Sequence, residues 1–177
     1  MDINYEHQRD FALYLLKTKR AVDTNYVKLL VARAYLQLGD YSMAYQYYDE
    51  MRNEGIPQDL DFVYVMFKLD RADEAEKRLD EMYGRRIKWE SNDEWWARYY
   101  ALRNDPENAI AHIRKFLLSI NNYQYFRIRA IKDKRIFENF LDMPEYNELI
   151  KEIEDKFWQD HERIKKTLEE KGLLEDL

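Results

Sequence analysis

Hydrophobic residues recur at helical spacing through most of this chain, and short polar or glycine-containing turns separate the runs. The clearest stretch, residues 25–57, holds two amphipathic segments on either side of Leu38-Gly39-Asp40-Tyr41. Gly39 favours the left-handed backbone that ends a helix, and Gly55-Ile56-Pro57 closes the second segment. The pattern predicts a helical hairpin. Because one hairpin cannot bury its apolar face alone, we expect neighbours of the same kind.

Segments of the same kind flank this hairpin on both sides. The pattern predicts a lone helix at 8–20, repeat units at 25–55, 57–84 and 90–120, and a closing segment at 121–177. Pro144 opens the last helix of that segment, because proline fits the first turn of a helix. No alternating run of Val, Ile and Thr indicates a strand. We therefore expect one all-α domain over residues 1–177, built of antiparallel helix pairs.

One alanine recurs at a nearly constant interval in the second helix of each pair. The alanines Ala12, Ala44, Ala75 and Ala109 are separated by 32, 31 and 34 residues. A small side chain at this point lets two helices approach to the normal packing distance. Other positions keep the same register: Val31-Ala32, Tyr35, Leu38-Gly39-Asp40-Tyr41 and Tyr48 in the first full unit; Phe62, Val63, Met66, Leu69 and Leu79 in the middle unit; Trp96-Ala97, Tyr100, Asp105 and Phe116 in the third.

On these residues the chain resembles the tetratricopeptide repeat (TPR) family, whose period is about 34 residues. The resemblance covers roughly residues 8–120. It implies a right-handed superhelix of stacked antiparallel helix pairs, a solenoid whose first helices line a concave, peptide-binding surface. The middle unit lacks the family's small residue and its turn glycine. A helical bundle without repeats and another helical-repeat family are the alternatives.

The two ends of the chain differ from the repeats. Lys132–Leu149 resembles a segment at the ends of bacterial TPR proteins, where an aromatic turn and a proline precede a terminal helix that caps the stack. Residues 144–177 carry eleven acidic and six basic side chains, whereas residues 111–135 carry seven basic and one acidic, so we expect the two to face each other. The lone helix at 8–20 matches the second helix of a repeat unit, but the first helix of that unit is missing. It is either an N-terminal cap or, as we expect, part of the tail of a longer protein.

Composition and charge narrow the function. The net charge of −6 disfavours a nucleic-acid-binding protein, and the absence of cysteine excludes disulfides and thiolate metal sites. Four glycines are too few for the usual phosphate loops, and no GxGxxG, GxxxxGK[ST] or GxSxG motif occurs. No apolar run is long enough to cross a bilayer, and no signal-peptide pattern opens the chain. We therefore expect a cytoplasmic protein without membrane contact.

Titratable residues form no catalytic constellation. His7, His112 and His161 lie far apart in sequence and lack a metal-ligand spacing, so we expect surface or interhelical roles for them. Carboxylate pairs such as Asp49-Glu50 and Asp93-Glu94 occupy adjacent helix positions, which diverge by about 100° and do not converge on one substrate. We therefore expect no enzyme activity, no metal and no cofactor.

The predicted function is a non-catalytic scaffold that binds a peptide or a partner protein in a groove. By register with the TPR family, the groove residues are Tyr26, Leu29, Arg33 and Gln37 on one first helix, Leu60, Tyr64 and Lys68 on the next, and Glu94, Arg98 and Leu102 on the third. Arg33, Tyr64 and Arg98 occupy equivalent positions, and two guanidiniums around an aromatic ring suit carboxylate or backbone contacts. Interhelical ion pairs and packing tyrosines are the alternative role.

Two further functions stay open. The chain is also interpretable as a self-association module at the tail of a larger bacterial regulator or sensor. Such a homo-oligomer would use the terminal helix or the aromatic residues Trp95, Trp96 and Tyr99. Nucleic-acid binding would use basic residues interleaved with aromatics, namely Arg127, Arg129, Lys132, Lys134, Arg135, Tyr123, Tyr125 and Phe126. The acidic net charge makes nucleic-acid binding the weaker hypothesis.

Overall fold

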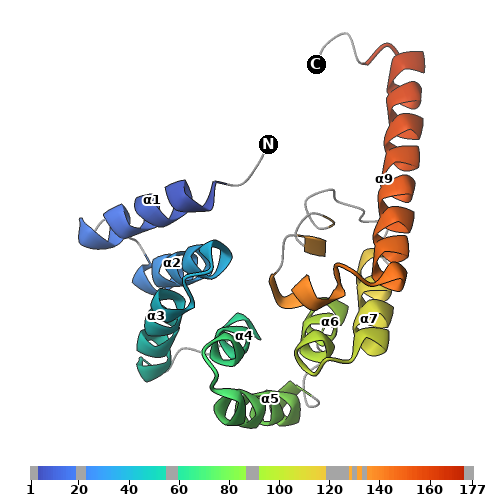
Figure 1. Cartoon of the computed structure of the whole chain (residues 1–177). Coiled ribbons are helices and arrows are strands. Elements are labelled where there is room, and N and C mark those ends of the chain that lie inside the picture. The colour runs from blue at the N-terminus through green and yellow to red at the C-terminus, as the bar shows by residue number, and fades with distance from the viewer. Residues whose placement is uncertain are drawn as a thin grey trace. The chain divides into compact units, whose positions relative to one another are not determined.

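The structure is a computed structural model that describes residues 4–18, 23–54, 60–86, 92–118, 128, 131–132 and 135–173. Within these residues every regular element is a helix, which confirms the predicted all-α class (Figure 1). The chain divides into two compact units, residues 1–91 and residues 92–177. The boundary lies at the start of the third predicted repeat unit, and each compact unit is described by itself.

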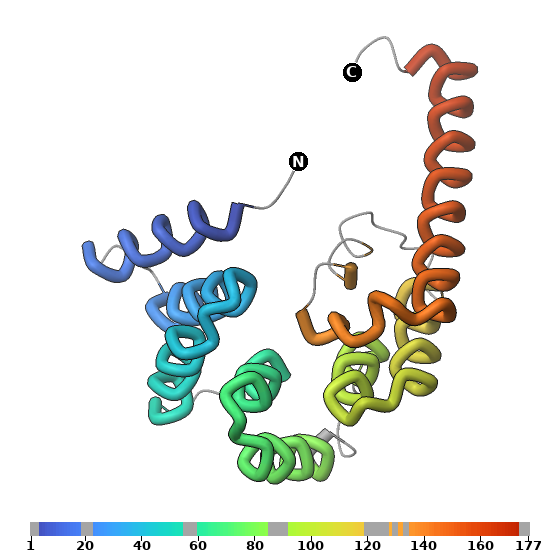
Figure 2. The backbone as a smooth tube through the Cα atoms, viewed as in Figure 1, coloured from blue at the N-terminus to red at the C-terminus, as the bar shows by residue number. Residues whose placement is uncertain are grey.

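The first unit is a series of helices in which each packs against the next (Figure 2). They are α1 (Tyr5–Lys17), α2 (Thr24–Leu38), α3 (Tyr41–Asn53), α4 (Leu60–Lys68) and α5 (Ala72–Arg86). The helix α1 corresponds to the predicted lone helix. The pairs α2–α3 and α4–α5 correspond to the first two predicted hairpins, and both pairs are in contact along their helices.

The second unit holds one further hairpin and the closing segment. Its described elements are α6 (Asp93–Leu102), α7 (Pro106–Leu118), a short 3-10 helix η1 (Arg135–Phe140) and α9 (Pro144–Glu170). The helix α6 packs against α7 and η1, and α9 packs against α7. Arg114 Nη1 lies 2.6 Å from Glu152 Oε2, and Lys132 Nζ lies 2.8 Å from Glu154 Oε1. These two ion pairs confirm that the acidic terminal helix faces the basic segment.

The same turn joins the two helices of all three hairpins. At Gly39 the backbone has φ +81°, the Gly39 N–H donates to Leu36 O at 3.1 Å, and the Asp40 N–H donates to Tyr35 O at 3.0 Å. This pair of bonds is the Schellman motif of a helix C-terminus. Asp70, with φ 57°, and Asn104, with φ 54°, occupy the left-handed position of the other two turns. The matching bonds there are Asp70 N to Phe67 O, Arg71 N to Met66 O, Asn104 N to Ala101 O and Asp105 N to Tyr100 O.

The turn also fixes the position of the recurring alanine. Ala44, Ala75 and Ala109 each lie five residues after the left-handed residue of their turn, and each is completely buried. Their N–H groups donate to the carbonyl oxygen four residues earlier, so all three sit at the same point of the second helix. Ala12 of α1 is buried in the same way. The alanine spacing in the sequence therefore marks equivalent positions in three second helices. The middle unit keeps this spacing although its turn has no glycine.

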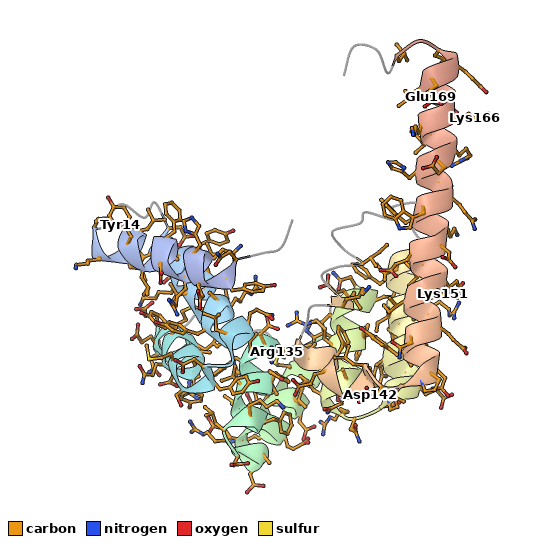
Figure 3. All side chains as sticks on the ribbon, turned by 45° about the horizontal axis from the view of Figure 1, so that its top comes forward. Tyr14, Arg135, Asp142, Lys151, Lys166 and Glu169 are labelled. Atoms are coloured by element: carbon orange, nitrogen blue, oxygen red, sulfur yellow. The ribbon has the colours of Figure 1, made fainter. Side chains whose placement is uncertain are left out.

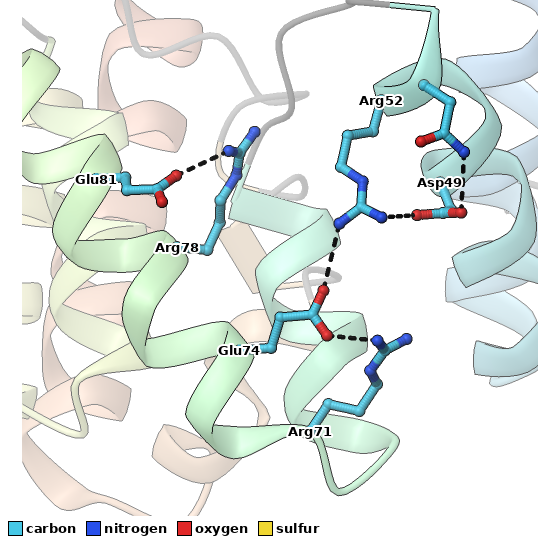
Figure 4. A network of polar contacts seen from close by, with 7 residues as sticks. Asp49, Arg52, Arg71, Glu74, Arg78 and Glu81 are labelled. Atoms are coloured by element: carbon cyan, nitrogen blue, oxygen red, sulfur yellow. Dashed lines mark hydrogen bonds and ion pairs between the residues drawn. The ribbon is translucent and has the colours of Figure 1, made fainter.

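In the first unit, ion pairs connect the corresponding helices of consecutive hairpins. Arg33 Nε of α2 lies 3.4 Å from Asp61 Oδ2 of α4, so the first helices are linked. Arg52 Nη1 of α3 lies 3.3 Å from Glu74 Oε1 of α5, so the second helices are linked too (Figure 4). Partly exposed ion pairs contribute about 0–1 kcal/mol each. Burial of a large side chain contributes more, about 1.5–3 kcal/mol, and Tyr48 of α3 and Phe62 of α4 are both fully buried with ring centroids 5.4 Å apart.

The closing segment is held by aromatic packing. Phe137 and Phe140 of η1 are buried, and the Phe140 ring meets the ring of Tyr146 at a centroid distance of 6.1 Å. Burial raises the pKa of Tyr146 to about 12, and its hydroxyl donates to Ile131 O at 3.4 Å. The aromatic turn and the proline predicted for this segment thus anchor the start of α9. No helix in the described ranges combines the length and the apolar character that crossing a membrane requires.

Candidate functional site

The predicted groove residues of α2 form one stripe along the helix. They are Tyr26, Leu29, Arg33 and Gln37, spaced at intervals of three or four residues. The Asp23 carboxylate accepts from the Tyr26 N–H at 3.0 Å and so fixes the start of the helix. The side chain of Tyr26 is 57% exposed, Arg33 is exposed, and Leu29 and Gln37 are half-buried. This stripe is available to a partner over most of its length.

Leu30 extends the stripe and was not predicted to belong to it. It lies one turn after Tyr26 and is 37% exposed. A leucine at helical spacing gives no signal of exposure, because the same residue type at the same spacing is usually buried. The exposed aromatic and aliphatic side chains at this end of α2 therefore form a small apolar surface.

Lys28 lies next to Leu29 in sequence but turns towards α3. Its Nζ lies 2.7 Å from Glu54 Oε1 and 3.5 Å from Glu50 Oε2. The hydrogen bond to Glu54 raises the pKa of Lys28, with a smaller opposing effect of burial. Lys28 thus holds α2 against the end of α3 and is separate from the exposed stripe.

Of the three groove residues predicted on α4, only Lys68 is exposed. Leu60 and Tyr64 are buried, so the prediction that they face a partner is wrong. The reason is that α4 is apolar on nearly every side, and a helix of that kind is buried all round. The Tyr64 ring packs edge-on against Tyr41 at a centroid distance of 6.1 Å. Lys68 is exposed, and its Nζ lies 5.4 Å from the centroid of the Tyr64 ring.

The exposed residues Tyr26, Leu30, Arg33 and Lys68, together with the half-buried Gln37, make up one candidate surface, which we call the α2–α4 face. Its two helices are joined by the ion pair between Arg33 and Asp61. One part of the face is apolar, and the other part carries two cations. The α2–α4 face thus combines an apolar contact with positively charged groups on neighbouring helices.

The predicted groove residues of α6 belong to the second unit. Glu94 and Leu102 are half-buried, and Arg98 is only 9% exposed. The turn register confirms that Arg33, Tyr64 and Arg98 are equivalent, since each lies six residues before its left-handed residue. The predicted row of solvent-facing guanidiniums is nevertheless wrong, because Tyr64 and Arg98 are buried.

The aromatic residues proposed as a self-association surface are packed inside the second unit. Trp95 and Tyr99 are each 7% exposed and stack at a centroid distance of 5.3 Å, and Trp96 is half-buried against both. These rings pack against one another along α6, and their assignment as an exposed interface is wrong for Trp95 and Tyr99, which are buried.

His112 joins the two helices of this hairpin. Its ring stacks on Tyr100 at 5.5 Å and on Trp96 at 6.2 Å, and its Nδ1 lies 2.7 Å from Asp93 Oδ1. The interhelical role expected for this histidine is thereby confirmed. Among the described residues, no group of three or more His, Asp and Glu side chains is placed to hold a metal ion.

The basic segment proposed for nucleic-acid binding is described only in part. Arg127, Arg129, Lys134, Tyr123, Tyr125 and Phe126 lie outside the described residues. Lys132 pairs with Glu154, and Arg135 is half-buried in η1. The described part of the segment therefore contributes to packing of the second unit.

Comparison of the chain with protein-family models, with curated proteins and with solved structures gave no match.

Proposed function

We propose that the chain is a non-catalytic protein-interaction module of the TPR type and that it binds a peptide segment of a partner protein on the α2–α4 face. The observation that carries this proposal is the exposed stripe of Tyr26, Leu30 and Arg33 on a first helix, extended by Lys68 of the next first helix. Aromatic residues and arginine are enriched where proteins bind one another.

The repeated geometry supports the TPR assignment. The left-handed residue, the buried alanine five residues later and the intervals of 31 and 34 residues between turns fit a TPR period of about 34. In that family the first helices carry the ligand contacts, and α2 and α4 are both first helices. The ion pair between Arg33 and Asp61 keeps their exposed faces next to each other.

The chemistry of the face defines the class of ligand. Tyr26 and Leu30 offer an apolar contact, and Arg33 lies seven residues after Tyr26, about 10 Å along the helix axis. Lys68 adds a second cation. The expected ligand is a peptide with a bulky apolar side chain and a carboxylate about 10 Å apart in its bound form. A guanidinium and an ammonium both bind carboxylates through charge-assisted hydrogen bonds.

Selection of peptides from a random displayed library tests the proposal. Peptides selected on the wild-type chain should combine an aromatic or aliphatic residue with Asp or Glu. The variant Tyr26→Ser/Lys68→Gln should bind them at least about tenfold more weakly, since removal of a hot-spot aromatic residue such as tyrosine costs about 2 kcal/mol or more. Lys77→Gln, at an exposed position of the second helix α5, is the matched control and should bind as wild type.

Neither altered residue of the test variant is needed for the fold. Both side chains are exposed, so helical content and thermal midpoint should match the wild type. Equal affinity of the double variant and the wild type for the selected peptides would refute the α2–α4 face as the binding surface.

A further inference from the structure

The long helix α9 has two halves with different surroundings. Its first half is anchored in the second unit by the buried residues Tyr146, Leu149, Ile150 and Ile153. Ile153 is the last residue of α9 that is buried, although the helix continues to Glu170. Figure 3 shows Lys151 in the anchored half and Lys166 and Glu169 on the half that extends past the other described elements of this unit.

The apolar stripe of α9 continues into this extended half. Phe157, His161, Ile164 and Leu168 follow Ile153 at intervals of three or four residues and so lie on one face. Ile164 is 55% exposed, and Trp158 beside the stripe is 51% exposed. The rings of Phe157, Trp158 and His161 lie within 6.1 Å of one another. An amphipathic helix face of this kind is typical of a helix that pairs with another helix.

We propose that this stripe pairs with the same stripe of a second copy of the chain, in an antiparallel, two-fold symmetric helix pair over residues 154–171. In this register Phe157 lies opposite Leu168 of the second copy, and His161 lies opposite Ile164 of the second copy. Because a two-fold axis repeats every contact, each of these pairs forms twice. The overlap is about 27 Å long at 1.5 Å per residue.

Charge complementarity favours a second copy in this orientation. The same register places Glu154, whose Oε1 also lies 2.8 Å from Lys132 Nζ of its own chain, opposite Lys171 of the second copy. It also brings Trp158 beside the stripe to within two residues of the level of Lys165 of the second copy, where an ammonium can lie over an indole ring. Both contacts are attractive and both occur twice.

A parallel pair in register would instead place Glu154 opposite Glu154 and Lys171 opposite Lys171 of the second copy, and these like charges repel each other. Its one favourable charged contact would join Asp160 to Lys165 of the second copy. The antiparallel arrangement also places the packed part of each second unit at opposite ends of the helix pair, so these parts do not compete for space. Since the overlap is short, the dimer should be reversible and dependent on concentration.

Sedimentation equilibrium over a range of protein concentrations tests the proposal. The wild-type mass should rise from 21.9 kDa towards twice that value as concentration increases. Ile164→Lys should raise the dissociation constant at least tenfold without changing helical content, because Ile164 is exposed in the single chain. Gln159→Lys introduces the same side chain on the opposite face of α9 and should leave the dissociation constant unchanged.

Distances between spin labels test the orientation. The chain has no cysteine, so one introduced cysteine gives one label per copy. An antiparallel pair offsets labels at residue 160, which flanks the stripe near its midpoint, by only about 8 Å along the axis and separates labels at residue 171 by about 26 Å, whereas a parallel pair gives short distances at both positions.

Three outcomes overturn the proposal: a constant mass of 21.9 kDa at all concentrations, a dimer unaffected by Ile164→Lys, or short distances at both labelled positions.

Discussion

Replacement of Gly39 by alanine isolates the energetic cost of the turn that all three hairpins share. Gly39 has φ +81°, and a Cβ built at this position would meet no atom within 4 Å. The alanine methyl group therefore causes no collision with the rest of the protein. Any loss of stability must come from the backbone conformation, because an L-residue in the left-handed region costs roughly 1–2 kcal/mol.

The expected net change follows from two opposing effects. The left-handed conformation costs the folded alanine variant about 1–2 kcal/mol. Alanine also restricts the unfolded chain relative to glycine, which returns about 0.4–1 kcal/mol. Gly39→Ala should therefore lower the free energy of unfolding by about 1 kcal/mol, or the thermal midpoint by about 2–4 °C for a chain of this size.

Asn104 provides the matched comparison. It occupies the same position of the third turn with φ 54°, and asparagine tolerates this conformation better than alanine does. Asn104→Gly should change stability by only a few tenths of a kcal/mol, whereas Asn104→Ala should destabilise by roughly as much as Gly39→Ala. The contrast separates the backbone effect from any effect of removing the asparagine side chain.

Urea unfolding monitored by circular dichroism measures these differences, with the slope against urea compared between variants to confirm that the same surface unfolds. A Gly39→Ala variant as stable as wild type would show that the left-handed turn does not limit the stability of the hairpin. An Asn104→Gly variant that loses over 1 kcal/mol would show that the three turns are not equivalent.

Three further predictions concern packing and charge. Ala44→Leu should destabilise the first unit by about 1–3 kcal/mol in urea unfolding, because Ala44 is completely buried where α3 meets its neighbours; an unchanged midpoint would contradict this close contact. Since the pKa of Tyr146 is raised from 10.0 to about 12, the unfolded chain loses this proton first, and stability should fall as pH rises from 10 towards 12. Tyr146→Phe should show a smaller fall over that range, and an identical pH dependence would count against the raised pKa. A double-mutant cycle on Arg33 and Asp61 should give a coupling energy of about 0.2–1 kcal/mol, and a value of zero would remove this ion pair as a link between α2 and α4.

The sequence predicted the helices and their register well because both depend on local chemistry. Asp23 and Asp40 accept from backbone N–H groups at the starts of α2 and α3, and Gly39 ends α2, as their residue types indicate. The middle turn was harder to recognise, because Asp70 replaces the glycine that marks the first turn. Its conformation is the same, since an aspartate can adopt positive φ when the flanking helices fix the chain.

The candidate site was predicted only in part, because exposure depends on tertiary packing. Register alone placed Arg33, Tyr64 and Arg98 in one row, yet only Arg33 is exposed. A tyrosine and an arginine carry enough apolar surface to be buried when their neighbours on the helix are apolar. Conversely, Leu30 and Ile164 read as core residues in sequence but are exposed, since no described element covers them.

Mapping of amide chemical shifts in the NMR spectrum, with a selected peptide added stepwise, shows directly whether the peptide binds to the α2–α4 face. We expect the largest shifts at Tyr26, Leu30, Arg33 and Lys68, on the α2–α4 face. Shifts confined to the second helices α3 and α5, or to the extended half of α9, would contradict this expectation.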